Sequence, residues 1–145
     1  MSDDHIPAFD RQLHNNYCST DYCCQNFRIT PEVFLPEFID FLHLNQWSTY
    51  AFVTAFNPYS VAQLSFIENQ GRHKKLLNSL PKDLTYLPAI ATDQAKQWPP
   101  ESGIFAFDAT LPEMIDLAHR FGQNAILWGT RTEKPVVLWT HGRLE

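Results

Sequence analysis

Thr49-Tyr50-Ala51-Phe52-Val53-Thr54-Ala55-Phe56 predicts a strand at the centre of a sheet. The stretch is rich in β-branched and aromatic residues and is apolar on both faces, as a strand covered on both sides must be. Asn57-Pro58-Tyr59 follows as a turn, because proline fixes φ and disfavours helix in the residue before it. We therefore expect a buried strand over 49–56 that ends at a polar turn.

Two helices and four further strands are expected downstream of this strand. Ser60-Val61-Ala62-Gln63 has the pattern of a capping box and predicts a helix from Ser60 to about Leu80. A second capping box, Thr110-Leu111-Pro112-Glu113, predicts a helix that ends before Gly122. Strands are predicted over 85–91, 104–107, 125–128 and 135–139, the last two forming a hairpin. Pro88 places the first of them toward a sheet edge, since proline cannot donate to a strand ladder.

The resulting order from residue 49 is β-α-β-β-α-β-β. It predicts an α+β fold of the ferredoxin-like split βαβ type with one added C-terminal strand and two helices on one face. The strand at 104–107 should then pair with the strand at 49–56. A parallel doubly wound sheet is the alternative, but too few helices lie between the strands to favour it.

The N-terminal part of the chain, 1–48, is predicted to be an irregular segment with one helix. That helix begins either at Thr30-Pro31-Glu32, where proline takes the first helical position, or at Pro36. A length of 145 residues fits one domain, so we expect 1–145 to form a single domain with its α+β core at 49–143.

Composition and charge predict a soluble cytoplasmic protein that binds neither nucleic acid nor membrane. The net charge of −5 disfavours nucleic acid, because neutralising phosphates is the main contribution to such binding. The chain has no apolar run near the ~18 residues that span a bilayer. Its first residues, Met1-Ser2-Asp3-Asp4-His5, carry two acids where a secretory signal carries Lys or Arg.

The cysteines invite a zinc interpretation that their spacing disfavours. His14, Cys18, Cys23 and Cys24 form H-x3-C-x4-C-C, but two adjacent cysteines differ from the usual C-x2–4-C ligand pair and no second pair follows. We therefore expect free or buried thiols and no metal. The chain also lacks G-x-S-x-G, H-E-x-x-H, a P-loop and G-x-G-x-x-G, so no cofactor is predicted.

Four stretches, taken in order, resemble the bacterial family catalogued as domain of unknown function 3293. They are Thr54–Ser60, Glu68–Arg72, Trp98–Ser102 and Phe121–Ile126. The resemblance covers residues 49–130. The family has no assigned activity, so the resemblance implies membership of a family but no mechanism.

A polar site is predicted where the strand at 49–56 ends. In the split βαβ arrangement this end lies beside the starts of the strands at 104–107 and 125–128, because these strands run antiparallel to it. The helix predicted from Ser60 would add free N–H donors at its positive end. The residues expected to meet there are Asn57, Ser60, Trp98, Glu101, Ser102, Gln123 and Asn124, with Glu68, Asn69 and Arg72 as secondary candidates.

The sequence leaves the function of this site open. Binding of a small polar ligand is the first hypothesis, since amide side chains offer both donors and acceptors. A protein-interaction module is the first alternative, and an exposed apolar patch would favour it. A small enzyme with Glu101 as acid or base is the second, although catalysis needs a partner group within reach. The same polar residues could also serve only to fix loops.

Overall fold

The computed structural model describes residues 6–61 and 63–141. The predictions that involve residues 1–5, Ala62 and 142–145 lie outside the described residues. The elements in chain order are α1 (Arg11–Cys18), β1 (Thr20–Cys24), β2 (Phe27–Ile29), α2 (Pro36–Asn45), β3 (Thr49–Thr54), the short 3-10 turn η2 (Pro58–Ser60), α3 (Phe66–Ser79), β4 (Thr85–Asp93), β5 (Glu101–Phe107), α4 (Leu111–Arg120), β6 (Ala125–Thr130) and β7 (Val136–Trp139).

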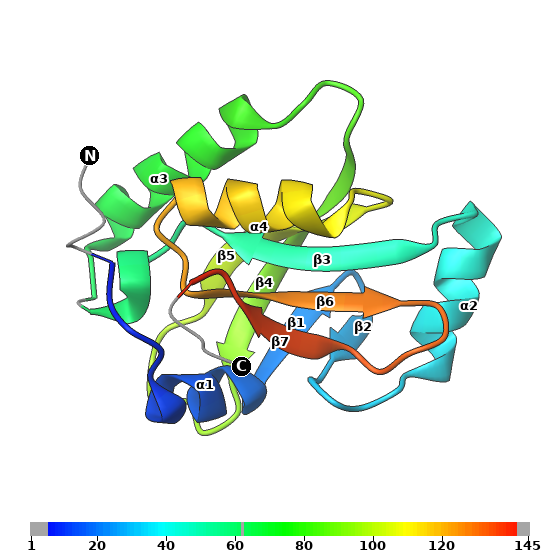
Figure 1. Cartoon of the computed structure of the whole chain (residues 1–145), viewed down its shortest axis with the longest axis horizontal. Helices are drawn as coiled ribbons and strands as arrows, with labels where there is room; N and C mark the ends of the chain where they lie inside the picture. Colours follow the sequence, from blue (N-terminus) through cyan, green and yellow to red (C-terminus); the bar gives the residue numbers. More distant parts are fainter. Residues whose placement is uncertain (1–5, 62, 142–145) are drawn as a thin grey trace.

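The strands form one curled seven-stranded sheet in the order β2-β1-β4-β5-β3-β6-β7 (Figure 1). Neighbouring strands are antiparallel in every pair of the described sheet. Among the four strands β4-β5-β3-β6, β3 is an inner strand, with β5 on one side and β6 on the other. The α+β class and the predicted pairing of the strand at 104–107 with the strand at 49–56 are therefore confirmed.

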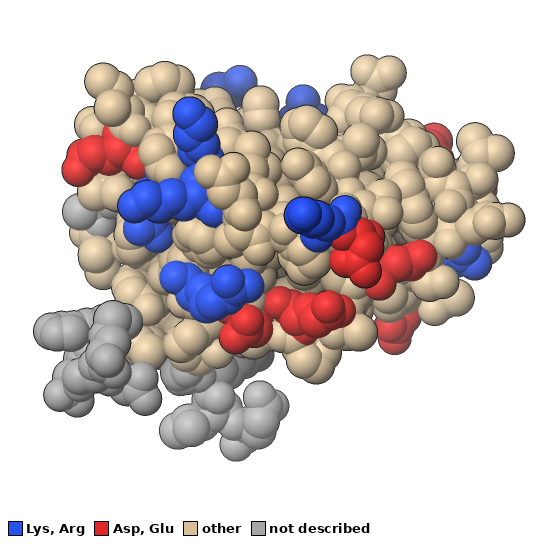
Figure 2. All heavy atoms as spheres, turned by 90° about the horizontal axis from the view of Figure 1, so that it is seen from above, with Lys and Arg blue, Asp and Glu red and all other residues tan. Residues whose placement is uncertain are grey.

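Helices α3 and α4 lie together over one face of the sheet (Figure 1). The capping box that starts α4 is confirmed, because the N–H of Glu113 donates to Oγ1 of Thr110 at 3.3 Å and the N–H of Thr110 donates to Glu113 at 2.8 Å. Figure 2 shows basic and acidic side chains near one another on this outer face. None of the described helices combines the length and apolar character that crossing a bilayer requires.

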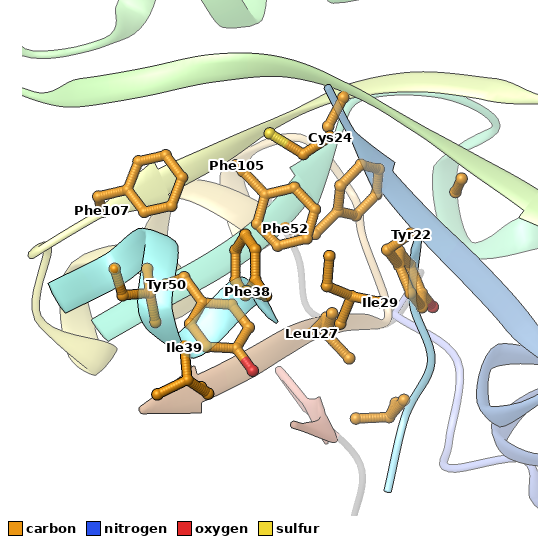
Figure 3. Packing of buried hydrophobic residues seen from close by; sticks show 14 residues of the cluster. Tyr22, Cys24, Ile29, Phe38, Ile39, Tyr50, Phe52, Phe105, Phe107 and Leu127 are labelled. Carbon is orange, nitrogen blue, oxygen red and sulfur yellow. The ribbon is translucent and has the colours of Figure 1, made fainter. Parts of the chain in front are cut away.

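The other face of the sheet encloses an aromatic core (Figure 3). Phe38 of α2 packs edge-on against Tyr50 of β3 at 4.9 Å between ring centroids. The ring of Phe52, also on β3, lies 5.0 Å from that of Tyr22 on β1. Paired aromatic rings bury much apolar area and contribute about 0.5–1.5 kcal/mol beyond it. The N-terminal segment is thus one wall of the hydrophobic core.

The prediction of an irregular N-terminal segment is wrong for 11–29. These residues form α1, β1 and β2, and β1 pairs with β4 from Thr20↔Asp93 to Cys23↔Ile90. The strand β1 was not predicted because it contains Asp21, and a buried acid is atypical of a strand. Its carboxylate is instead satisfied by Arg28 at 3.0 Å and Thr30 at 2.8 Å. Thr30 therefore does not cap a helix, and α2 begins at Pro36, the second of the two predicted starts.

The prediction of a helix from Ser60 is also wrong. Helix α3 begins at Phe66, and its capping box is formed by Ser65 and Glu68. Asn57, Tyr59 and Ser60 have φ of 45°, 56° and 57°, in the left-handed region where a helix cannot continue.

Strand β4 is not an edge strand, because β5 and β1 flank it. β1 reaches only from Ile90 to Asp93, however, so Pro88 lies where β4 has β5 as its one neighbour. The missing N–H of the proline therefore costs no ladder bond on the β1 side. The edge character predicted from Pro88 holds for half of the strand only.

Candidate functional site

A partly open cavity of about 350 Å³ lies where β3 ends and β5 and β6 begin. It is on the face of the sheet that also carries the aromatic core. Six of the seven predicted site residues line it: Asn57, Ser60, Trp98, Glu101, Gln123 and Asn124. Ser102 does not line it; its carbonyl oxygen accepts a 2.6 Å bond from Thr54 at the end of β3.

Asn57 is the centre of the polar groups at this end of the sheet. Its Oδ1 accepts from the N–H of Leu64 at 2.8 Å and from Nδ2 of Asn69 at 3.0 Å. Its Nδ2 donates to Glu101 at 2.9 Å and to Gln63 at 3.3 Å. Asparagine tolerates the left-handed backbone that this position needs. The residue therefore shapes the loop before α3 and also orients the Glu101 carboxylate.

Glu101 is a half-buried carboxylate at the start of β5. Burial raises its pKa above the usual value, and the hydrogen bond from Asn57 offsets part of that rise. Among the described residues no Lys, Arg or His lines the cavity, and none forms an ion pair with Glu101. The carboxylate thus faces the cavity without a counter-charge from the described chain.

Gln123 and Asn124 join the start of β6 to the turn after β3. Nε2 of Gln123 donates to the carbonyl of Phe56 at 3.0 Å. Nδ2 of Asn124 donates to the carbonyl of Tyr59 at 2.8 Å and to the phenol oxygen of Tyr17 at 2.9 Å. These bonds use the amide donors, so both residues hold the cavity wall in place.

The N-terminal segment supplies a wall that the sequence did not predict. Leu13, Asn16 and Tyr17 of α1 and Thr20 and Tyr22 of β1 line the cavity. The Tyr17 hydroxyl lies 2.9 Å from Oγ of Ser60 and so connects α1 to the turn η2. The i, i+3, i+4 spacing of the three α1 residues and the alternation of the two β1 residues were the available signals.

One known family matches the middle part of the chain, which includes the predicted site residues. A family model described as protein of unknown function (DUF3293) matches residues 53–126. The chain belongs to this family. Searches of the curated proteins and of the solved structures each found no match. All seven predicted site residues lie within the DUF3293 segment, whereas the wall formed by α1 and β1 lies outside it.

The secondary candidates of the DUF3293 segment have structural contacts. Asn69 is buried and accepts the N–H of Asn57 at 2.9 Å. Arg72 donates from Nε to the carbonyl of Ala55 at 2.6 Å and from a terminal nitrogen to the carbonyl of Phe121. Glu68 completes the capping box with Ser65, and no residue of α3 lines the cavity. The prediction that a helix N-terminus opens onto the site is therefore wrong.

The cysteines lie outside the DUF3293 segment and apart from the cavity lining. Cys24 is buried, which raises the pKa of its thiol to about 11. The Sγ of Cys18 lies 3.6 Å from Nε2 of His14. No group of three or more His, Cys, Asp or Glu able to hold a metal occurs among the described residues. That the cysteines bind no zinc stays a prediction, which elemental analysis of the purified protein tests.

Proposed function

We propose that this protein binds a small polar molecule in the cavity at the end of the sheet. The observation that carries the proposal is a 350 Å³ cavity lined by polar side chains from α1, the turn after β3, β5 and β6. Ligand cavities have volumes of roughly 300–1,000 Å³ and combine apolar walls with a few placed polar groups. Apolar side chains here include Phe52, Leu127 and Val137.

The backbone around the cavity supports a binding role. Asn57, Tyr59 and Ser60 have positive φ within four consecutive residues, and for Tyr59 and Ser60, which tolerate this region less well than asparagine, the cost is of order 1–3 kcal/mol each. Such costs persist where surrounding contacts impose them, and they concentrate at ligand sites. Asn57 and Ser60 both line the cavity. The turn therefore presents two polar side chains to the cavity at the expense of stability.

The scaffold of this site is proposed to be a ferredoxin-like split βαβ unit. The strand order β4-β5-β3-β6, with antiparallel neighbours, supports this assignment. Helices α3 and α4 follow β3 and β5 and lie on one face, as that unit requires (Figure 1). The remaining strands β1, β2 and β7 extend the sheet at its two sides.

A protein-interaction role is the second candidate, favoured by one observation. Val61, Phe66 and Ile67 are exposed by 76%, 73% and 82%, and Val61 also lines the cavity. Exposed apolar side chains that gather in one region suit a protein partner. The enzyme alternative depends on Glu101, whose raised pKa suits an acid or base. Its hydrogen-bond partner Asn57, however, is an amide that does not titrate.

Ligand-dependent melting across a panel of metabolites tests the binding proposal. A molecule that binds the folded state at a hundred times its dissociation constant stabilises it by about 2.7 kcal/mol. Ala91→Leu adds a larger side chain to the cavity wall and should abolish the shift. Ala95→Leu, on the exposed loop after β4, is the matched control and should retain it. A shift that survives Ala91→Leu would place binding elsewhere and overturn the proposal.

A further inference from the structure

We infer that the molecule bound in this cavity is a small organic amine, with its cationic nitrogen on Glu101 and an apolar body against the aromatic floor. The inference rests on the proposed function and adds to it the chemical class of the ligand.

The charges around the cavity carry the first step. Among the described lining residues Glu101 alone has a carboxylate, and none has a cationic side chain. A carboxylate that is even half withdrawn from water, as Glu101 is, is costly unless a counter-charge or several hydrogen bonds compensate it. Within the described part of the chain, one side chain donates to this carboxylate, from Nδ2 of Asn57 to Oε2 at 2.9 Å. A ligand ammonium group supplies both the missing charge and further donors.

The rest of the cavity surface complements a cation with an apolar body. Tyr22, Phe52 and Trp98 line it, and aromatic faces attract cations within about 6 Å. Leu127 and Val137 add an aliphatic surface deeper in the core. This combination of one carboxylate with aromatic and aliphatic side chains matches an amine rather than a fully polar molecule such as a sugar.

The arrangement also opposes anionic ligands. A phosphate or carboxylate would enter beside Glu101 and meet no Lys, Arg or His in the described lining. The helix end nearest in sequence, that of α3, begins at Phe66, and no residue of α3 lines the cavity. Like charges at short range raise the free energy of binding, so the cavity selects against anions as well as for cations.

Three probes of one size and different charge test the inference. They are 2-phenylethylamine, 2-phenylethanol and phenylacetate, each titrated at neutral pH into the protein of residues 1–145. Binding is followed through the ¹H,¹⁵N signals of the Trp98 indole and the Asn124 side-chain amide, both of which lie at the cavity. We expect the amine to bind about tenfold or more tightly than the alcohol, as a hydrogen bond to a charged group implies, and phenylacetate to bind most weakly.

The variant Glu101→Gln should reduce amine affinity to the level of the alcohol while leaving alcohol binding unchanged. Glu37→Gln, an exposed acid in the first turn of α2, is the matched control and should leave all three affinities unchanged. If the alcohol or phenylacetate binds as tightly as the amine, the amine inference is overturned and the binding proposal stands. If no probe shifts these signals, the inference is overturned, and the metabolite panel decides the binding proposal separately.

Discussion

Replacing Asn57 with alanine tests whether this residue builds the end of the sheet. The change removes the acceptor for the N–H of Leu64 and for Nδ2 of Asn69, and the donor to Glu101. Asn69 keeps a second acceptor, the carbonyl of Leu64 at 3.4 Å. The Leu64 N–H and the Glu101 carboxylate therefore lose the most.

The expected loss in unfolding free energy follows from these contacts. Leaving a buried donor or acceptor unsatisfied costs about 1–3 kcal/mol, and the low end applies to both groups because the cavity is partly open to water. Alanine at a φ of 45° adds about 1 kcal/mol that asparagine largely avoids. Asn57→Ala should thus cost about 3–4 kcal/mol, or roughly 10 °C in melting temperature for a chain of this length.

Urea unfolding measures the loss, provided that the slope of the transition is unchanged. Asn57→Gly removes the same side chain but accepts the left-handed backbone, so it should be roughly 0.5–1 kcal/mol more stable than Asn57→Ala. Asn78→Ala, on the exposed surface of α3, is the matched control and should hold or raise stability. A loss below about 1 kcal/mol for Asn57→Ala, or an alanine variant as stable as the glycine variant, would refute this reasoning.

Four further substitutions probe neighbouring features. Burial raises the pKa of Glu101 in the folded state above its unfolded value of about 4.3. Ionising this carboxyl therefore destabilises the folded state increasingly as pH rises from the unfolded pKa through the folded pKa. Glu101→Gln should be more stable than wild type at pH 7 but not below pH 4, as urea unfolding of both proteins at the two pH values would show. Gly122→Ala places a Cβ at a φ of +68° and 3.1 Å from Pro58, so it should lower the free energy of unfolding by about 1–2 kcal/mol in thermal melts. Gly71→Ala places its Cβ where no heavy atom lies within 4 Å, so it should raise that free energy by about 0.5–1 kcal/mol. Tyr17→Phe removes the hydroxyl that joins α1 to the turn η2 and should cost about 1 kcal/mol, with faster amide exchange in α1; unchanged exchange would show that this bond does not hold the helix.

The sequence predicted elements whose signals are local. The strand at 49–56 carries its β-branched and aromatic residues within the strand itself, and the α4 cap lies within four residues. The start of α3 was misplaced because Ser60…Gln63 and Ser65…Glu68 both fit a capping pattern. Asn57 favours the second, because its Oδ1 accepts the N–H of Leu64, and α3 begins only after Ser65.

The candidate site also has one part that the sequence predicted and one part that it did not. The polar residues at the ends of β3, β5 and β6 were predicted to meet because antiparallel order alone brings those ends together. The wall from α1 was not predicted, because nothing local to Tyr17 indicates that its phenol meets Asn124, 107 residues later. Asp21 likewise is acceptable inside β1 only because Arg28, Thr30 and Gln94 bond it after folding.

The pairing of β1 with β4 has a consequence for how the chain folds during synthesis. Thr20 pairs with Asp93, which leaves the ribosome 73 residues later. At ~5–20 residues per second this delay is roughly 4–15 s. Through that time β1 has only the three-residue β2 as a partner, so its other edge is free to pair with other nascent chains. A slowed translation rate should therefore favour aggregation of this protein over that of one whose strands pair with near neighbours.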